Sequence, residues 1–177
     1  LISFDSTNPC KIRTNAKIQG LKTGEQILGI DMRPANGKLY GLGSSSQIYV
    51  FEGNRATAVG MPLSVTLQGS AFGFDFNPAV DRIRISSNSG QNLRAHPDTG
   101  AIVATDKPLI YAGGAPVKPF VAGSAYTNPD VDPATTTTLY NIEAGLDLLV
   151  KQDPPNDGVL NIVGAHNVNA TGLSGFD

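Results

Sequence analysis

The stretch Phe72-Gly73-Phe74-Asp75-Phe76-Asn77-Pro78 decides the fold, because words of the same form recur along the chain. The word occurs earlier as Gly29-Ile30-Asp31-Met32-Arg33-Pro34, and Gly175-Phe176-Asp177 begins it again. A looser copy, Gly123-Ser124-Ala125-Tyr126-Thr127-Asn128-Pro129, has Ala125 in place of the Asp. A whole word repeated at a period of about 45 residues indicates a repeat architecture.

Each copy of the word is followed by three further segments with strand character and intervening turns. The expected second strands are residues 38–42, 82–85 and 138–142. The third strands are residues 47–51, 92–96 and 146–150, and the fourth are 56–59, 101–104 and 159–163. The leading segments 1–5 and 11–18 resemble a third and a fourth strand. Each unit therefore contains four short antiparallel strands.

Such units are typical of the blades of a β-propeller, because each small twisted sheet buries its faces only against its neighbours around a ring. We expect one all-β, β-propeller-like domain over residues 1–177, with about four blades of four antiparallel strands. Its expected parts are a partial blade at 1–22, blades at about 27–68, 71–118 and 121–168, and a partial strand at 172–177. The ring would be incomplete by one strand. A β-sandwich, whose turns have similar spacing, is the alternative.

Composition supports a globular chain built of strands and turns. The 177 residues include 20 Gly and 12 Pro, and 13 Lys+Arg against 15 Asp+Glu give a net charge of −2. The 40% hydrophobic content excludes disorder, and no apolar run reaches the length of about 18 residues that a membrane span needs. Clusters of Lys and Arg are absent from the sequence, so a nucleic-acid partner is not expected.

The repeated words, together with the stretches 81–84, 90–94 and Pro97-Asp98-Thr99-Gly100, resemble the family described as domain of unknown function 4394. The resemblance runs over nearly the whole chain and is most specific from Phe72 to Gly100. It implies a secreted or cell-surface location, as in exported bacterial proteins, and a propeller-like repeat, but no activity. Typical members continue past the closing Gly-Phe-Asp with further strands. Either this chain is a piece of a longer protein, or something else supplies its last strands.

The repeated Asp residues are the first candidate for chemistry. Asp31, Asp75 and Asp177 each fall at the start of the expected inner strand, where a ring of carboxylates could hold a divalent cation or orient a substrate. The alternative is structural, because an Asp beside a Gly and before a Pro can accept backbone N–H bonds and fix the same turn in every unit. Ala125 interrupts the ring.

Three arginines form the second candidate, a binding site for an acidic ligand or partner. Arg82 and Arg84 alternate with apolar residues on one face of a strand, and Arg94 follows on the next. The alternative is that these side chains pair with nearby carboxylates. The candidates for that pairing are Asp75, Asp81 and Asp98.

Two weaker signals lie on expected loops. Asp130 and Asp132, in Asn128-Pro129-Asp130-Val131-Asp132-Pro133, have the spacing of part of a calcium loop, but the Gly and the bidentate Glu of an EF-hand are missing. Calcium here is the one cofactor that the residues suggest. Asn169-Ala170-Thr171 is a glycosylation sequon, which matters only in a eukaryotic secretory host.

The favoured interpretation is an extracellular, non-enzymatic module that binds a protein partner or assembles with copies of itself through unpaired strand edges. A second hypothesis is a metal-dependent propeller hydrolase or lyase that uses Asp31 and Asp75. A third is glycan binding, with exposed Tyr40, Tyr49 or Tyr126 stacking on sugar rings, although the chain contains no Trp.

Overall fold

The fold, taken from a computed structural model that describes residues 1–114, 116–132 and 134–177, is built of short strands. The described residues contain one helical element, the 3-10 turn Pro155–Asp157. No helix among them is long and apolar enough to cross a membrane. The strands form four sheets, which confirms the all-β prediction and differs from the two layers of a β-sandwich.

Three of the sheets follow the three complete copies of the repeat. Sheet I consists of β3 (Ile27–Arg33), β4 (Lys38–Gly43), β5 (Ile48–Glu52) and β6 (Arg55–Val59), paired antiparallel in chain order. Sheet II consists of β7 (Phe72–Asn77), β8 (Arg82–Ser87), β9 (Asn92–Ala95) and β10 (Ile102–Thr105). Sheet III contains β12 (Val121–Tyr126), β13 (Leu139–Glu143), β14 (Leu148–Gln152) and β15 (Val159–Ala165).

The fourth sheet is a hairpin of β1 (Ile2–Asp5) and β2 (Asn8–Asn15). Two details differ from the expected units. Strand β11 (Ile110–Tyr111) falls within the expected unit 71–118 but pairs in parallel with β15, because the segment leaving sheet II crosses to the outer edge of sheet III. Residues 172–177 form no strand and belong to none of the sheets, because they meet β12 through side-chain packing and not through a hydrogen-bonded ladder.

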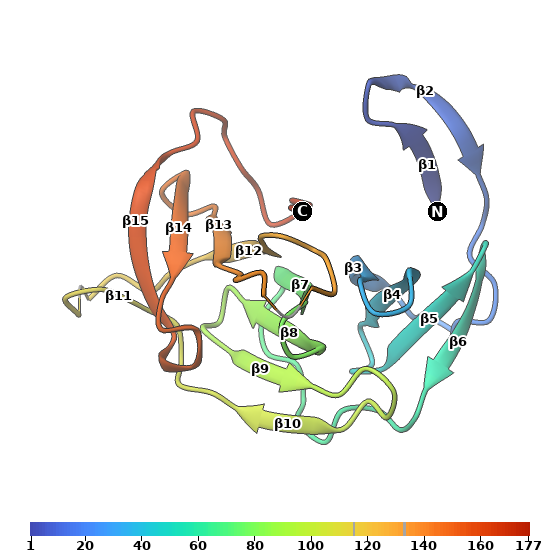
Figure 1. The fold of residues 1–177 in the computed structure, drawn as a ribbon, viewed down its shortest axis with the longest axis horizontal. Coiled ribbons are helices and arrows are strands. Elements are labelled where there is room, and N and C mark those ends of the chain that lie inside the picture. The colour runs from blue at the N-terminus through green and yellow to red at the C-terminus, as the bar shows by residue number, and fades with distance from the viewer. Residues whose placement is uncertain (115, 133) are drawn as a thin grey trace.

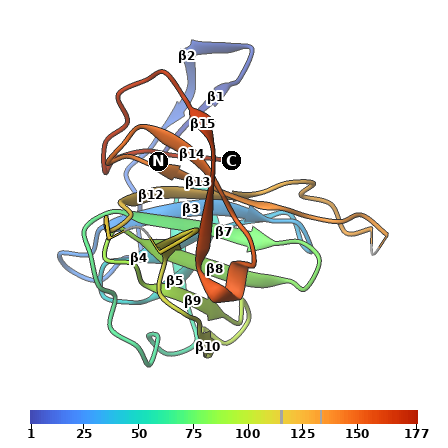
Figure 2. The ribbon, with the colours of Figure 1, turned by 90° about the vertical axis from the view of Figure 1, so that its left-hand side faces the viewer.

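The first strands of the three sheets meet at the centre of the molecule. Figure 1 shows β3, β7 and β12 side by side there, with the later strands of each sheet further out. Figure 2 shows the β1–β2 hairpin projecting beyond the rest of the molecule, and residues 127–132 and 134–138, between β12 and β13, extending away from the sheets. The C-terminal residues return to the centre, beside β12.

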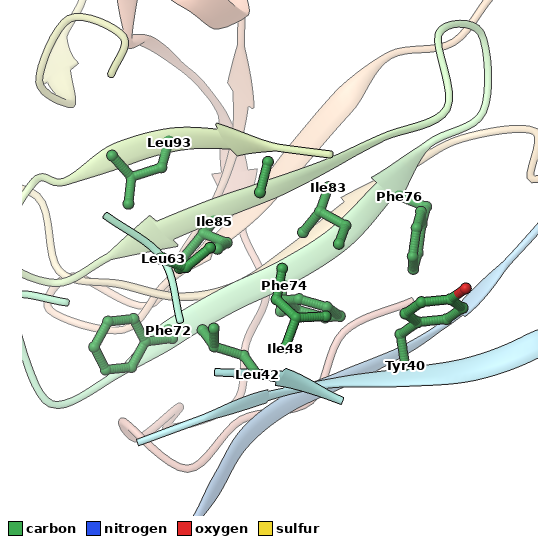
Figure 3. Close-up of a cluster of buried hydrophobic side chains, with 11 residues drawn as sticks. Tyr40, Leu42, Ile48, Leu63, Phe72, Phe74, Phe76, Ile83, Ile85 and Leu93 are labelled. Atoms are coloured by element: carbon green, nitrogen blue, oxygen red, sulfur yellow. The ribbon is translucent and has the colours of Figure 1, made fainter. Parts of the chain in front are cut away.

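Sheets I and II are held together by an apolar core. Side chains from β4 and β5 face those of β7, β8 and β9, and Figure 3 shows them interdigitating. The Tyr40 and Phe76 rings meet edge to face with their centroids 5.2 Å apart, and Phe74 makes a similar contact with Phe76. Alternating positions of both sheets are therefore buried on this side.

Glycines of the repeated word allow the central strands to approach each other closely. A Cβ atom at Gly29 would lie 2.7 Å from Cβ of Phe74, and one at Gly123 would lie 3.0 Å from Cβ of Phe176. At Gly73 it would overlap the side chain of Ser124 and lie 2.8 Å from the Ser124 backbone nitrogen. In each case the Gly of one unit contacts the residue after the Gly of the next, so the word encodes the packing between units.

We predict that Gly73→Ala destabilises the fold by about 1–3 kcal/mol or more, because its methyl group meets backbone that cannot move aside. Gly164→Ala is the matched control, since nothing lies within 4 Å of its Cβ position in β15. Urea unfolding of both variants measures the difference. Equal midpoints for Gly73→Ala and the control would show that the central strands have room to separate.

Candidate functional site at the centre of the fold

The repeated word brings three carboxylates together at the centre. Asp31 lies on β3, Asp75 lies on β7, and Asp177 ends the C-terminal segment. Their nearest carboxylate oxygens all lie within 4.8 Å of one another. The three Asp residues of the predicted ring are thus neighbours. Ala125 occupies the equivalent position on β12.

Asp31 and Asp75 also join neighbouring sheets. The backbone N–H of Phe76 donates to Asp31 Oδ2 over 2.8 Å, and that of Tyr126 donates to Asp75 Oδ2 over the same distance. Each carboxylate therefore binds the central strand of the following sheet. The sequence suggested, as an alternative to a cation site, that each Asp accepts backbone N–H bonds and fixes a turn within its own unit. Backbone N–H groups do donate to these carboxylates, but the bonds from Phe76 and Tyr126 come from the following unit.

Burial changes the protonation of this pair. Asp75 is only 3% exposed, and its burial, with the negative charge of Asp31 as the next cause, raises its pKa to about 9. Burial also raises the pKa of Asp31, against the opposing effect of the N–H bonds from Phe76 and Met32. At neutral pH Asp75 therefore holds a proton, which allows its buried carboxyl group to lie beside the half-buried one of Asp31.

The cluster offers limited means of holding a cation. Both oxygens of Asp31 accept backbone N–H bonds, the second from Met32 over 2.6 Å, and a cation would have to displace the proton of Asp75. No His or Cys of the described residues joins the group. A cavity of about 370 Å³ opens beside Asp177, lined by Tyr140 and Phe176 among others, and supplies space next to the carboxylates.

The arginines of the second candidate site are occupied within the protein. Arg84 is 2% exposed and donates to Asp106 Oδ2 over 2.6 Å, to Asn92 over 2.8 Å and to Asn156 over 2.9 Å. Arg94 binds the same carboxylate through two N–H bonds of 2.8 and 2.9 Å. Their partner is Asp106, which none of the sequence patterns singled out.

Arg82 has no carboxylate partner at all within salt-bridge distance among the described residues, and its guanidinium donates to the backbone carbonyls of Val80 and Asp81. The predicted partners Asp81 and Asp98 instead bind Arg33, at N–O distances of 2.5 Å each. Arg33 is buried at the end of β3 and joins sheet I to two turns of sheet II. Arg33, Asp81 and Asp98 therefore stabilise the contact between sheets I and II.

The remaining predicted residues do not converge on a site. Asp130 and Asp132 are exposed and accept the backbone N–H groups of Asp132 and Ala134, while Pro133 lies outside the described residues. Asn169 is exposed, as a sequon requires. The premise of exposed tyrosines for glycan stacking is wrong, because sheet packing buries all three. These are Tyr40, Tyr49 and Tyr126.

A model of the family described as Domain of unknown function (DUF4394) matches residues 1–177, so the chain belongs to this family. The match covers every residue, including the three Asp positions and the closing Gly175-Phe176-Asp177. No curated protein matches the chain.

The folded protein keeps a proton on Asp75 up to a pKa of about 9, whereas in the unfolded chain this carboxyl loses its proton above its ordinary pKa of 3.8. The free energy of unfolding should therefore fall as pH rises from about 4 to about 9. We predict that Asp75→Asn removes this fall and is more stable than the wild type at pH 8 by about 1 kcal/mol or more. The amide keeps an acceptor for Tyr126 and needs no proton. Thermal unfolding across this pH range measures the effect.

Asp98→Asn is the control of opposite sign. The bond from Arg33 lowers the pKa of Asp98, so its contribution is lost as pH falls and not as pH rises. Parallel pH profiles for the wild type and Asp75→Asn would contradict a protonated Asp75.

Proposed function

We propose that this member of the DUF4394 family is an extracellular, non-enzymatic module of propeller type that binds a protein partner or copies of itself. The extracellular location rests on the resemblance to exported bacterial proteins. The propeller reading is supported by three sheets whose first strands meet at the centre through the same Gly contact. The β1–β2 hairpin and the C-terminal segment represent the fourth unit of this arrangement.

The observation that carries the binding function is the exposure of the β1–β2 hairpin. Ile2, Phe4 and Ile12 are each 53% exposed on one face of this two-stranded sheet. Two strands alone are marginally stable, and a free strand edge with exposed apolar residues favours pairing with another chain. The polar residues of the other face, Ser3 and Thr14, bond to each other. The hairpin is therefore suited to an interface.

The free edge of β1 can be located from its hydrogen bonds. Leu1 and Ala16 exchange backbone bonds of 2.8 and 3.0 Å, so the next bonded pair is Ser3 with Thr14, and the N–H groups of Ile2 and Asn15 face outward on opposite edges. Proline at either position removes an outward donor and leaves the hairpin bonds intact.

We predict a concentration-dependent increase in mass in light scattering coupled to size exclusion. Ile2→Pro should weaken this association about tenfold or more, because it blocks the β1 edge, whereas Asn15→Pro, which blocks the opposite edge of β2, should leave it unchanged. Hydrogen exchange should show rapid exchange at β1 in dilute protein. A monomer at every concentration, with β1 protected as strongly as β7, would contradict the proposal.

A metal-dependent hydrolase or lyase is the second candidate, favoured by the convergence of Asp31, Asp75 and Asp177. Stoichiometric calcium or zinc in elemental analysis, and a rise in melting temperature with added metal that Asp177→Asn abolishes, would support it. We expect neither at neutral pH, because the proton on Asp75 competes with the cation. Stoichiometric metal in the purified protein would overturn that expectation.

A further inference from the structure

A cavity of about 260 Å³ opens between sheets II and III, at the ends of β7 and β12. Sheet II supplies Asn77 to its lining, and sheet III with the turn after β14 supplies Tyr126, Lys151 and Asp153 among others. Both sheets are complete units of the repeat, so the cavity does not depend on the fourth unit. At about 30 Å³ for each water molecule, its volume gives room for one small organic ligand.

Two hydrogen-bond donors on this lining are free. Tyr126 is 6% exposed, and its hydroxyl accepts a bond of 3.3 Å from Arg84 Nε, but no described residue accepts the proton of that hydroxyl. Asn77 Oδ1 accepts the backbone N–H of Ala79 over 3.0 Å, which leaves Asn77 Nδ2 without an acceptor in the described part of the chain. Because a buried donor without a partner costs free energy, a ligand that supplies acceptors is favoured here.

Arg82 lies beside this lining and is available to a ligand. It stands opposite Asn77 in the β7–β8 ladder and two positions from Arg84, so the three side chains share one face of sheet II. Arg82 Nη1 donates to the backbone carbonyls of Val80 and Asp81, while Nε and Nη2 bind no acceptor among the described residues. Of the three arginines that the sequence suggested for an acidic ligand, only Arg82 is not bound to a carboxylate.

The charges around the cavity leave Arg82 without a counter-ion. Four guanidinium groups lie along this part of sheet II with three carboxylates; they belong to Arg33, Arg82, Arg84 and Arg94, and to Asp81, Asp98 and Asp106. All three carboxylates are bound by the arginines other than Arg82. The remaining charged pair of the lining, Lys151 with Asp153 at 2.8 Å, is neutral as a whole. Arg82 is therefore the cation that an external anion would pair.

We propose that the cavity binds one small hydroxylated carboxylate, a sugar acid by chemical class. The carboxylate would lie across the planar Nε and Nη2 edge of Arg82, with Asn77 Nδ2 and the Tyr126 hydroxyl as further donors. A hydroxyl of the ligand would donate to Asp153 Oδ1, since Lys151 binds the other oxygen. This ligand site goes beyond the proposed binding of proteins and does not rest on it.

The lining distinguishes this class from simpler ligands. A neutral sugar leaves Arg82 without a counter-ion, and acetate brings no hydroxyl for Asp153. Inorganic phosphate supplies oxygens to Arg82, but its second negative charge would lie beside the carboxylate of Asp153. The fit therefore requires a single carboxylate together with hydroxyl groups.

Galacturonate is the probe for this site. We predict that the full chain binds galacturonate one to one in isothermal titration calorimetry, and that galactose, acetate and inorganic phosphate each bind about tenfold more weakly or not at all. An oligosaccharide of the same acid distinguishes the source of the ligand. Equal or tighter binding of the oligosaccharide assigns a residue of an acidic polysaccharide, and weaker binding assigns the free acid; both results support the site.

Variants of the full chain test the position. Arg82→Gln removes the free cation, and Asn77→Asp places a negative charge beside it while keeping the acceptor for Ala79. Each should weaken galacturonate binding about tenfold or more. Arg55→Gln is the matched control, because Arg55 is exposed on β6, away from the cavity, and should leave binding unchanged. Thermal unfolding of all three variants checks that they fold.

The contrary outcomes each overturn one part of the inference. Galacturonate binding that folded Arg82→Gln and Asn77→Asp both leave unchanged would overturn the assigned position. Galactose, acetate or phosphate binding as tightly as galacturonate would overturn the ligand class. Absence of heat for every probe at about 10 mM would overturn the site itself, and would leave the proposed protein-binding function untouched.

Discussion

The close approach of the central strands is the constraint on which the rest of the structure depends. Gly29 and Gly73 lie against the following unit at a distance that leaves no room for a side chain, and Gly123 makes a tight contact of the same kind. The carboxylates of Asp31 and Asp75 then bind backbone N–H groups across the same junctions. Because the strands meet here, the outer strands diverge, and sheet II lies between sheets I and III with both of its faces packed against them.

The two complete junctions between sheets use different chemistry. Sheets I and II meet through an apolar core, whereas sheets II and III meet through a buried polar network around Arg84 and Asp106. Gln152 and Asn141 continue that network into sheet III through a bond of 3.0 Å. Buried polar groups need their own partners, so sheet III fits sheet II and would leave charges unpaired against sheet I. The order of the sheets is therefore set by which faces are apolar and which are polar.

The repeated word was sufficient to predict the all-β class and the four strands of each complete unit, since period and turn residues are local signals. It also placed Asp31, Asp75 and Asp177 together. Their hydrogen-bond donors could not be predicted, because Tyr126 lies on another unit, 51 residues from Asp75. Asp106 was missed for the same reason: it follows β10 without any motif, and only the packing of two sheets brings Arg84 to it. Spacing along the chain carries no information about such partners.

Ala125 leaves sheet III without the carboxylate-to-amide bond that joins sheet I to sheet II and sheet II to sheet III. The contact of Gly123 with Phe176 is then held by van der Waals packing alone among the described interactions. The backbone N–H of Ala170 in the same segment donates to Asp147 of sheet III over 2.8 Å, but no carboxylate of β12 takes part, whereas β3 and β7 each supply one. The junction between sheet III and the C-terminal segment therefore lacks the fastening that the two junctions between complete sheets share.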